Sequence, residues 1–127
     1  MSREKVFTEN APSAIGFYNQ AIVSDNMVFT AGQIPLDPKT GEVVSDDFTK
    51  QVEQTLINID AVLQEAGTNL LNTIKFTVFI TDLDKYPELN AVFKKRFENF
   101  EPPARSVVEV SALPKNVQIE IDCIATL

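Results

Sequence analysis

Residues 47–80, DFTKQVEQTLINIDAVLQEAGTNLLNTIKFTVFI, decide the fold of this chain. Through residues 47–66 the apolar side chains recur at spacings of three and four, at Phe48, Val52, Leu56, Ile59, Leu63 and Ala66. That spacing is typical of an amphipathic helix, with Asp46 or Asp47 as its N-cap and Gly67 just past its end. Residues 74–81 then alternate with a period of two, which predicts a strand.

The rest of the chain supplies further strands and one more helix. Strand-like runs of β-branched and aromatic residues are expected at 6–8, 18–23, 27–34, 105–110 and 117–125. Pro87 suits the first turn of a second helix. The face of this helix that is expected in the core consists of Leu89, Val92 or Phe93, Arg96 or Phe97, and Phe100. The order β-β-α-β-α-β-β over residues 1–127 predicts one α+β domain with two helices on one face of a sheet.

The other face of this sheet lacks a cover within the chain. In the last strand Val117, Ile119, Ile121, Cys123 and Ala125 share one face, while Gln118, Glu120, Asp122 and Ile124 share the other. We expect Phe79, Val107 and Ile124 to lie together on this second face. A mixed face with several apolar residues favours oligomerisation.

Composition narrows the class of function. The 127 residues are 44% hydrophobic and 23% charged, with a net charge of −7, so a nucleic acid or an anionic membrane is disfavoured as a partner. No apolar run reaches the ~20 residues of a membrane span, and the first residues lack a signal-peptide pattern. The single cysteine excludes an intrachain disulfide, which favours a cytoplasmic location. With no histidine and no clustered cysteine, a metal site is not expected.

Two charged residues are the main functional candidates. Arg105 follows a stiff Pro102-Pro103-Ala104 lead-in, and Glu120 lies in a later strand. A fixed guanidinium near a strand-borne carboxylate suits a site for a small organic anion, with the carboxylate handling a proton or a water. The alternatives are a surface or interface salt bridge for Arg105 and a solvated or paired carboxylate for Glu120.

Three blocks of sequence carry a family resemblance. They are Asn10-Ala-Pro with residues 15–21 (IGFYNQA), residues 31–35 (AGQIP), and the set formed by residues 103–106 (PARS), 113–115 (LPK) and 119–121 (IEI). In this order the chain resembles the RidA-type reactive intermediate deaminases of the Rid (YjgF-like) family. The resemblance implies a bacillus-type chorismate-mutase-like fold, a homotrimer with clefts between subunits, and no metal or organic cofactor.

The resemblance also implies a reaction in amino-acid metabolism. Members hydrolyse 2-iminobutyrate and 2-iminopropanoate, released by pyridoxal-phosphate enzymes, to 2-keto acids and ammonia. By this resemblance Arg105 grips the substrate carboxylate and Glu120 orients the attacking water. The implied substrate-binding residues are Tyr18, Ala31, Gly32, Asn90, Ser106 and Val107, the last two through their backbone.

Two positions depart from the family pattern. Phe17 replaces a common proline before Tyr18, and Val107 replaces a common cysteine. Because imine hydrolysis needs no covalent intermediate, the valine is compatible with activity. Packing alone is the alternative for Tyr18 and Asn90, and close backbone approach is the alternative for Gly32. For the whole protein, the alternative is a non-catalytic module that binds small carboxylates such as keto acids; a ribonuclease-like or chaperone-like role fits the composition poorly.

Overall fold

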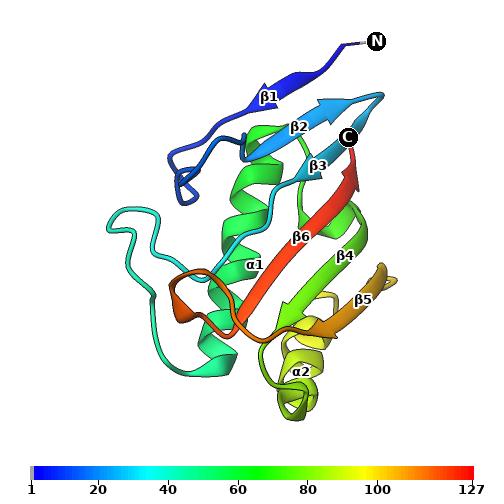
Figure 1. Cartoon of the computed structure of the whole chain (residues 1–127). Coiled ribbons are helices and arrows are strands. Elements are labelled where there is room, and N and C mark those ends of the chain that lie inside the picture. The colour runs from blue at the N-terminus through cyan, green and yellow to red at the C-terminus, as the bar shows by residue number, and fades with distance from the viewer. Residues whose placement is uncertain (1) are drawn as a thin grey trace.

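The computed structural model describes residues 2–127 and is built around one six-stranded sheet. Figure 1 shows the strands in the spatial order β1-β2-β3-β6-β4-β5. The strands are β1 (Glu4–Val6), β2 (Ala21–Ser24), β3 (Met27–Thr30), β4 (Thr73–Ile80), β5 (Ala104–Glu109) and β6 (Ile119–Thr126). All neighbours pair antiparallel except β4 and β5, which are parallel. From β2 onward the elements follow the predicted order β-β-α-β-α-β-β, and the short run expected near Val6 forms the edge strand β1 before them.

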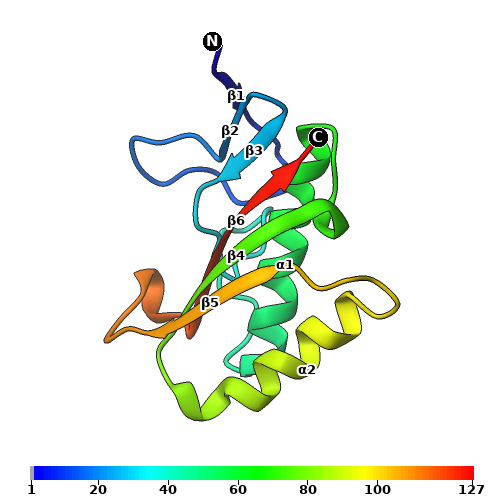
Figure 2. The ribbon, with the colours of Figure 1, turned by 90° about the vertical axis from the view of Figure 1, so that its right-hand side faces the viewer.

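Two helices cover one face of the sheet, as the sequence predicts (Figure 2). They are α1 (Phe48–Glu65) and α2 (Tyr86–Arg96), and short 3₁₀ turns lie at Leu70–Asn72, Leu83–Lys85 and Pro114–Asn116. Asp47 caps α1 by accepting a hydrogen bond from the backbone nitrogen of Lys50 at 3.0 Å. Gly67 follows the helix with φ +97°, a conformation that glycine adopts without steric cost. The apolar stripe of α1 therefore lies against the sheet.

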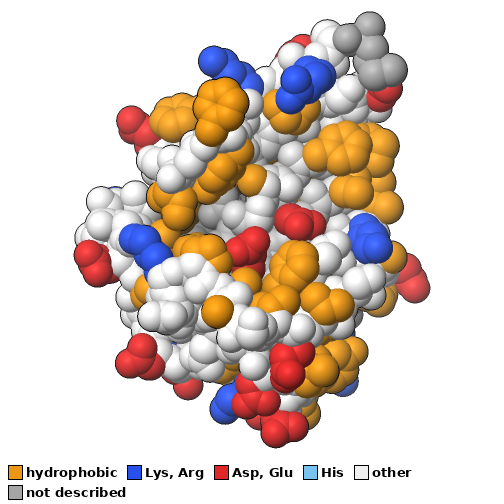
Figure 3. All heavy atoms as spheres, in the orientation of Figure 1, with side chains coloured by type: hydrophobic (Ala, Val, Ile, Leu, Met, Phe, Trp, Pro, Cys, Tyr) orange, Lys and Arg blue, Asp and Glu red, His pale blue; other side chains and the backbone are white. Residues whose placement is uncertain are grey.

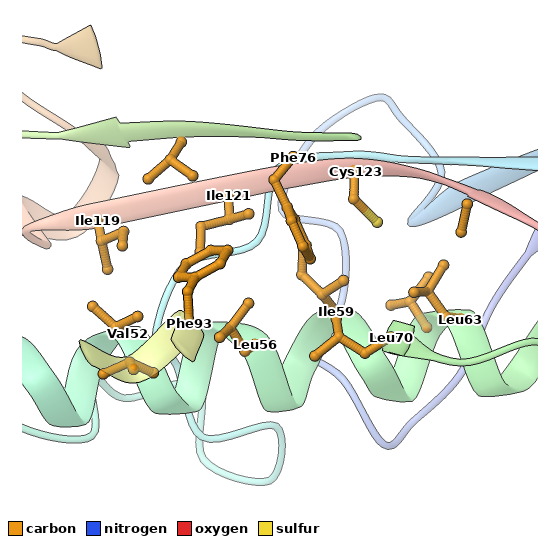
Figure 4. Close-up of a cluster of buried hydrophobic side chains, with 14 of the residues drawn as sticks. Val52, Leu56, Ile59, Leu63, Leu70, Phe76, Phe93, Ile119, Ile121 and Cys123 are labelled. Atoms are coloured by element: carbon orange, nitrogen blue, oxygen red, sulfur yellow. The ribbon is translucent and has the colours of Figure 1, made fainter. Parts of the chain in front are cut away.

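The core fills the space between this sheet face and the helices (Figure 4). The ring of Phe76 on β4 meets the ring of Phe93 on α2 edge-on, with centroids 5.2 Å apart. Phe97 packs on both rings and is buried, but Phe100 lies beyond the end of α2 and is 55% exposed. Its expected place in the core is therefore wrong, because the helix ends at Arg96 and the apolar spacing no longer applies.

Two strand boundaries near the β2–β3 hairpin differ from the prediction. Asp25 and Asn26 both have positive φ values, 51° and 62°, as a tight two-residue hairpin turn requires. The strand that follows ends at Thr30 instead of residue 34, and only Gln33 bridges back to β6, at Ile121. The first strand lies at 4–6 instead of 6–8. Residues 31–36 thus leave the sheet and are free to wall a cavity.

The register sorts residues between the two faces. Glu120 pairs with Phe79, and this row continues to Val108 on β5. Val107 pairs instead with the buried Val78 and lies on the helix side. The expectation for Val107 on the open face is therefore wrong by one residue of register, which reverses the side of a strand residue. Phe79 and Ile124 do lie on the open face, where Figure 3 shows acidic groups in a hollow edged by hydrophobic side chains.

Candidate functional site

Arg105 lies on the helix side of β5, beside a cavity of about 1060 Å³. Its Nη2 donates to the Tyr86 hydroxyl at 3.0 Å and to the Asn90 Oδ1 at 2.5 Å. The guanidinium carbon is 4.9 Å from the centroid of the Phe93 ring, a distance typical of a cation–π contact. Asn90, Val107 and Arg105 all line this cavity.

This arrangement holds the guanidinium by one edge. Both hydrogen bonds to Tyr86 and Asn90 come from Nη2, and in residues 2–127 no hydrogen bond occupies Nε or Nη1 of Arg105. Both two-donor edges of a guanidinium include Nη2, so the hydrogens left free on Nε and Nη1 bind a carboxylate oxygen singly, aided by the positive charge. The Arg105 cavity is therefore suited to a small organic acid.

Glu120 lies in a second cavity of about 380 Å³ on the open side of the sheet. Tyr18, Ala31 and Gly32 line it together with Glu120. Burial raises the pKa of the Glu120 carboxyl, and the nearby Asp122 carboxylate raises it further. A carboxyl with a raised pKa exchanges protons closer to neutral pH, as general acid–base catalysis requires.

Gly32 makes room for the Glu120 carboxylate. A Cβ placed on Gly32 would lie 2.3 Å from Oε2 and 2.9 Å from Cδ of Glu120. Real side chains do not approach this closely, so the missing side chain lets the backbone of residue 32 meet the carboxylate directly. Any larger residue here must displace Glu120.

Buried amides hold the loops that wall the Glu120 cavity. The side-chain nitrogen of Gln20 donates to the carbonyls of Thr8 and Pro12 at 3.1 and 2.8 Å, while its Oε1 accepts from the Thr8 nitrogen at 2.7 Å. From α1, Asn58 donates to the carbonyls of Ile34 and Leu36, both at 3.0 Å. Hydrogen bonds to buried side chains therefore hold the loops of the cavity wall in place.

The two candidate catalytic residues lie on opposite faces of the sheet. Arg105 shares its row with Phe76 on the helix side, whereas Glu120 shares its row with Phe79 on the open side. The structure thus groups Asn90 and Val107 with Arg105, and Tyr18, Ala31 and Gly32 with Glu120. The Ser106 side chain lies on the open face and lines neither cavity. One chain alone does not bring the two charges together.

Sequence reasoning missed two residues at these sites. Tyr86 shares the Arg105 guanidinium with Asn90, and the spacing of four residues on one helix face was the available signal. Gln20 stands within the block of residues 15–21, but a buried anchoring amide has no periodic signature. Both residues support parts of the two cavities that the sequence motifs do identify.

The described chain offers neither a cluster of metal ligands nor a helix suited to a membrane. Within residues 2–127, no three His, Cys, Asp or Glu side chains gather in a way that could ligate a metal ion. No helix among these residues has the length and apolar character needed to cross a membrane. The polar side chains that line the two cavities carry carboxylate, guanidinium, ammonium, amide and hydroxyl groups.

Similarity to known proteins shows the family of this chain. The sequence profile of the family described as Endoribonuclease L-PSP matches residues 8–127. A RutC family protein of Pyrococcus horikoshii is 50% identical over 123 residues, covering 97% of both chains. The chain belongs to the Rid family. A relative from Escherichia coli K12, 47% identical over 94% of both chains, is named 2-iminobutanoate/2-iminopropanoate deaminase.

Solved structures agree with this membership. A conserved Rid-family protein from Yersinia pestis has a TM-score of 0.96 at 45% identity, covering 99% of this Rid-family chain and all of its own. Escherichia coli TdcF, crystallised with bound serine, has a TM-score of 0.93 at 42% identity, with 98% of both chains covered. The α+β, chorismate-mutase-like fold expected from the sequence is confirmed.

Proposed function

We propose that this chain is an imine deaminase that hydrolyses 2-imino acids such as 2-iminobutanoate and 2-iminopropanoate to 2-keto acids and ammonia, without a bound cofactor. We further propose that each site forms between two copies of the chain, in a homotrimer. The observation that carries this proposal is the separation of two incomplete half-sites on opposite sheet faces, one with Arg105 and one with Glu120. The deaminase named among its relatives supports the reaction.

The Arg105 half binds the acid end of the substrate. The bonds of Nη2 to Tyr86 and Asn90 fix the plane of the guanidinium, and a hydrogen of Nε or Nη1 then binds a substrate carboxylate oxygen in this plane. Fixing this plane also fixes the adjacent imine carbon, and such orientation is a large source of rate enhancement. β5 is the last strand in the sheet order, so the backbone of Ser106 and Val107 has an outer edge available to contact the imine.

The Glu120 half supplies the water chemistry. The imine nitrogen is protonated; water adds to its carbon, the C=N electron pair moves to nitrogen, and Glu120 takes one water proton, which gives a neutral carbinolamine. Glu120 returns this proton to the amine nitrogen, the carbon–nitrogen bond breaks, and ammonia leaves with the bonding electron pair. The hydroxyl proton then passes through Glu120 to the ammonia as the carbonyl forms, so that the products are the 2-keto acid and ammonium. A raised carboxyl pKa suits these proton transfers, which typically contribute about 10²–10⁴-fold to a rate.

Mixing two inactive variants tests both the reaction and the shared site. Keto-acid release is measured while a threonine dehydratase supplies the imine. We expect Arg105→Ala and Glu120→Ala each to lose the acceleration, with an exposed lysine variant, Lys39→Ala, as the active control. After the two inactive variants are unfolded and refolded together, random pairing in a ring restores about a quarter of wild-type activity.

Two results would contradict the proposal. If both charges acted within one chain, the mixture would stay inactive, because each chain lacks one of them. If wild-type protein bound 2-ketobutyrate in the Arg105 cavity but never accelerated keto-acid release, the chain would be a carboxylate-binding module instead of an enzyme.

A further inference from the structure

Phe17 is the most exposed large hydrophobic residue in the described chain. Its relative exposure is 109%, and Ile15 beside it is 63% exposed. Tyr18 turns back instead, because its hydroxyl accepts a hydrogen bond from the Ile15 nitrogen at 3.2 Å and its ring lines the Glu120 cavity. The loop projects on the side of the sheet away from the helices (Figure 2). Phe17 thus points away from its own chain next to a half-site.

The cavity beside Arg105 is apolar and open. Its wall includes Phe93, Phe97, Phe100, Pro102 and Pro103. Phe93 and Phe97 are buried within their own chain, whereas Phe100 at the rim is 55% exposed and Pro102 is exposed, so the rim presents apolar surface with no cover from its own chain. Exposed apolar surface of this kind, next to polar groups, is typical of an interaction site.

The two surfaces also complement each other in charge. Lys94, Lys95 and Arg105 outnumber Glu98 in the lining of the Arg105 cavity. On the open face near the Phe17 loop, the carboxyl groups of Glu120 and Asp122 outnumber the ammonium group of Lys75. Opposite charges steer two surfaces into one orientation and fix their register. The apolar contact then supplies most of the affinity.

We propose that Phe17 seats in the Arg105-side cavity of a second copy of this chain. This contact anchors the loop that carries Tyr18 and so sets Glu120 of one copy against Arg105 of the next. The inference rests on the shared site of the proposed function, but it can be tested without turnover.

Disulfide trapping tests the contact directly. A full-length chain carrying Phe17→Cys and Ala91→Cys is oxidised and run on a non-reducing gel; Ala91 is exposed on α2 and lines the cavity. Within one chain the loop and α2 lie on opposite sides of the sheet (Figure 2), beyond the Cα separation that a disulfide tolerates. Buried Cys123 does not compete, since burial raises the pKa of its thiol to about 12.

We expect covalent dimers and trimers from the paired variant only. The control pairs Phe17→Cys with Ile57→Cys, since Ile57 is 48% exposed on α1 and lies outside the Arg105 cavity. Equal cross-linking in the control, or none in the test pair, would overturn the inference. The mixed Arg105→Ala and Glu120→Ala sample tests the proposed function separately: if its activity is restored while cross-linking fails, only the Phe17 contact is refuted.

A second variant measures the strength of the anchor. Phe17→Ser removes an apolar side chain that makes no core contact in its own chain, so we expect an unchanged circular dichroism spectrum. Because burial of a phenylalanine stabilises an interface, we expect the loss of this side chain to raise the dissociation constant between copies about tenfold to a hundredfold. Sedimentation over a dilution series measures this change, and unchanged association would overturn the inference.

Discussion

Replacing Gly32 with alanine tests whether the position of the Glu120 carboxylate matters for activity. The new Cβ would lie 2.3 Å from Oε2 of Glu120, where ordinary contacts begin near 3.4 Å. The carboxylate must therefore retreat by roughly 1 Å, a displacement that can cost about 10²-fold in rate. We expect the acceleration of imine hydrolysis to fall by about this factor.

The same substitution should leave the fold intact. The atom displaced is the end of a flexible side chain, and Gly32 does not have a positive φ. Exchanging glycine for alanine under those conditions changes the free energy of unfolding by only about 0.4–1 kcal/mol, in the stabilising direction. Urea unfolding and the coupled keto-acid assay therefore separate the two effects.

A double-mutant cycle decides the cause. If Gly32→Ala acts through Glu120, then adding it to Glu120→Ala should cost nothing further, because the displaced group is already absent. Full activity of Gly32→Ala, or weaker binding of 2-ketobutyrate by the double variant than by Glu120→Ala alone, would refute the reasoning. In the second case residue 32 would act on the substrate itself.

Four other outcomes are expected. Arg105→Lys offers a single point charge in place of a planar fork and should raise KM about tenfold or more in the same assay; an unchanged KM would remove the carboxylate clamp. Burial raises the folded-state pKa of Glu120 and Asp122, so the folded chain holds more protons than the unfolded chain just above their ordinary pKa values. The free energy of unfolding should therefore fall as pH rises through the folded pKa values, and a variant with Glu120→Gln and Asp122→Asn should lose this decline in a series of urea titrations. Cys123 is buried with a pKa of about 12, so it should be alkylated in concentrated urea but not in native buffer; equal rates would contradict its burial. Asn58→Asp removes the donor to the Ile34 and Leu36 carbonyls and leaves the Leu36 carbonyl unpaired, since that of Ile34 still accepts from the Leu36 nitrogen. It should lower the free energy of unfolding by about 1–3 kcal/mol, whereas an unchanged midpoint would show that the loop finds other donors.

Periodic features of the sequence predicted most of the fold. The helix of residues 48–65 and the strand of residues 73–80 repeat their patterns over several turns or pairs, and caps such as Asp47 mark the ends. The predicted strand ends were wrong where tertiary contacts determine them, as at Thr30, where the chain leaves the sheet. The predicted sheet face of Val107 was wrong for a different reason, since the sequence of a strand does not reveal its register with β4.

The candidate site was only partly readable. Arg105 and Glu120 were identified by motif, and the structure gives each one a cavity and polar or close-packed neighbours. Their placement on opposite faces was not foreseen, because it depends on strand parity across three paired strands. Gln20 was missed because its role lies in hydrogen bonds that leave no spacing pattern, whereas the four-residue spacing of Tyr86 and Asn90 was a signal that the sequence analysis did not use.

The exposed edge of β5 has a consequence for how the protein must be handled. An outermost strand with unpaired backbone groups is a template for any extended chain that meets it, and Val107 and Val108 add apolar surface there. If neighbouring copies cover this edge, a newly folded chain avoids aggregation best when the protein concentration is high enough for rapid assembly. The yield of refolding from denaturant would then rise at moderate protein concentration, although refolding is usually carried out at high dilution.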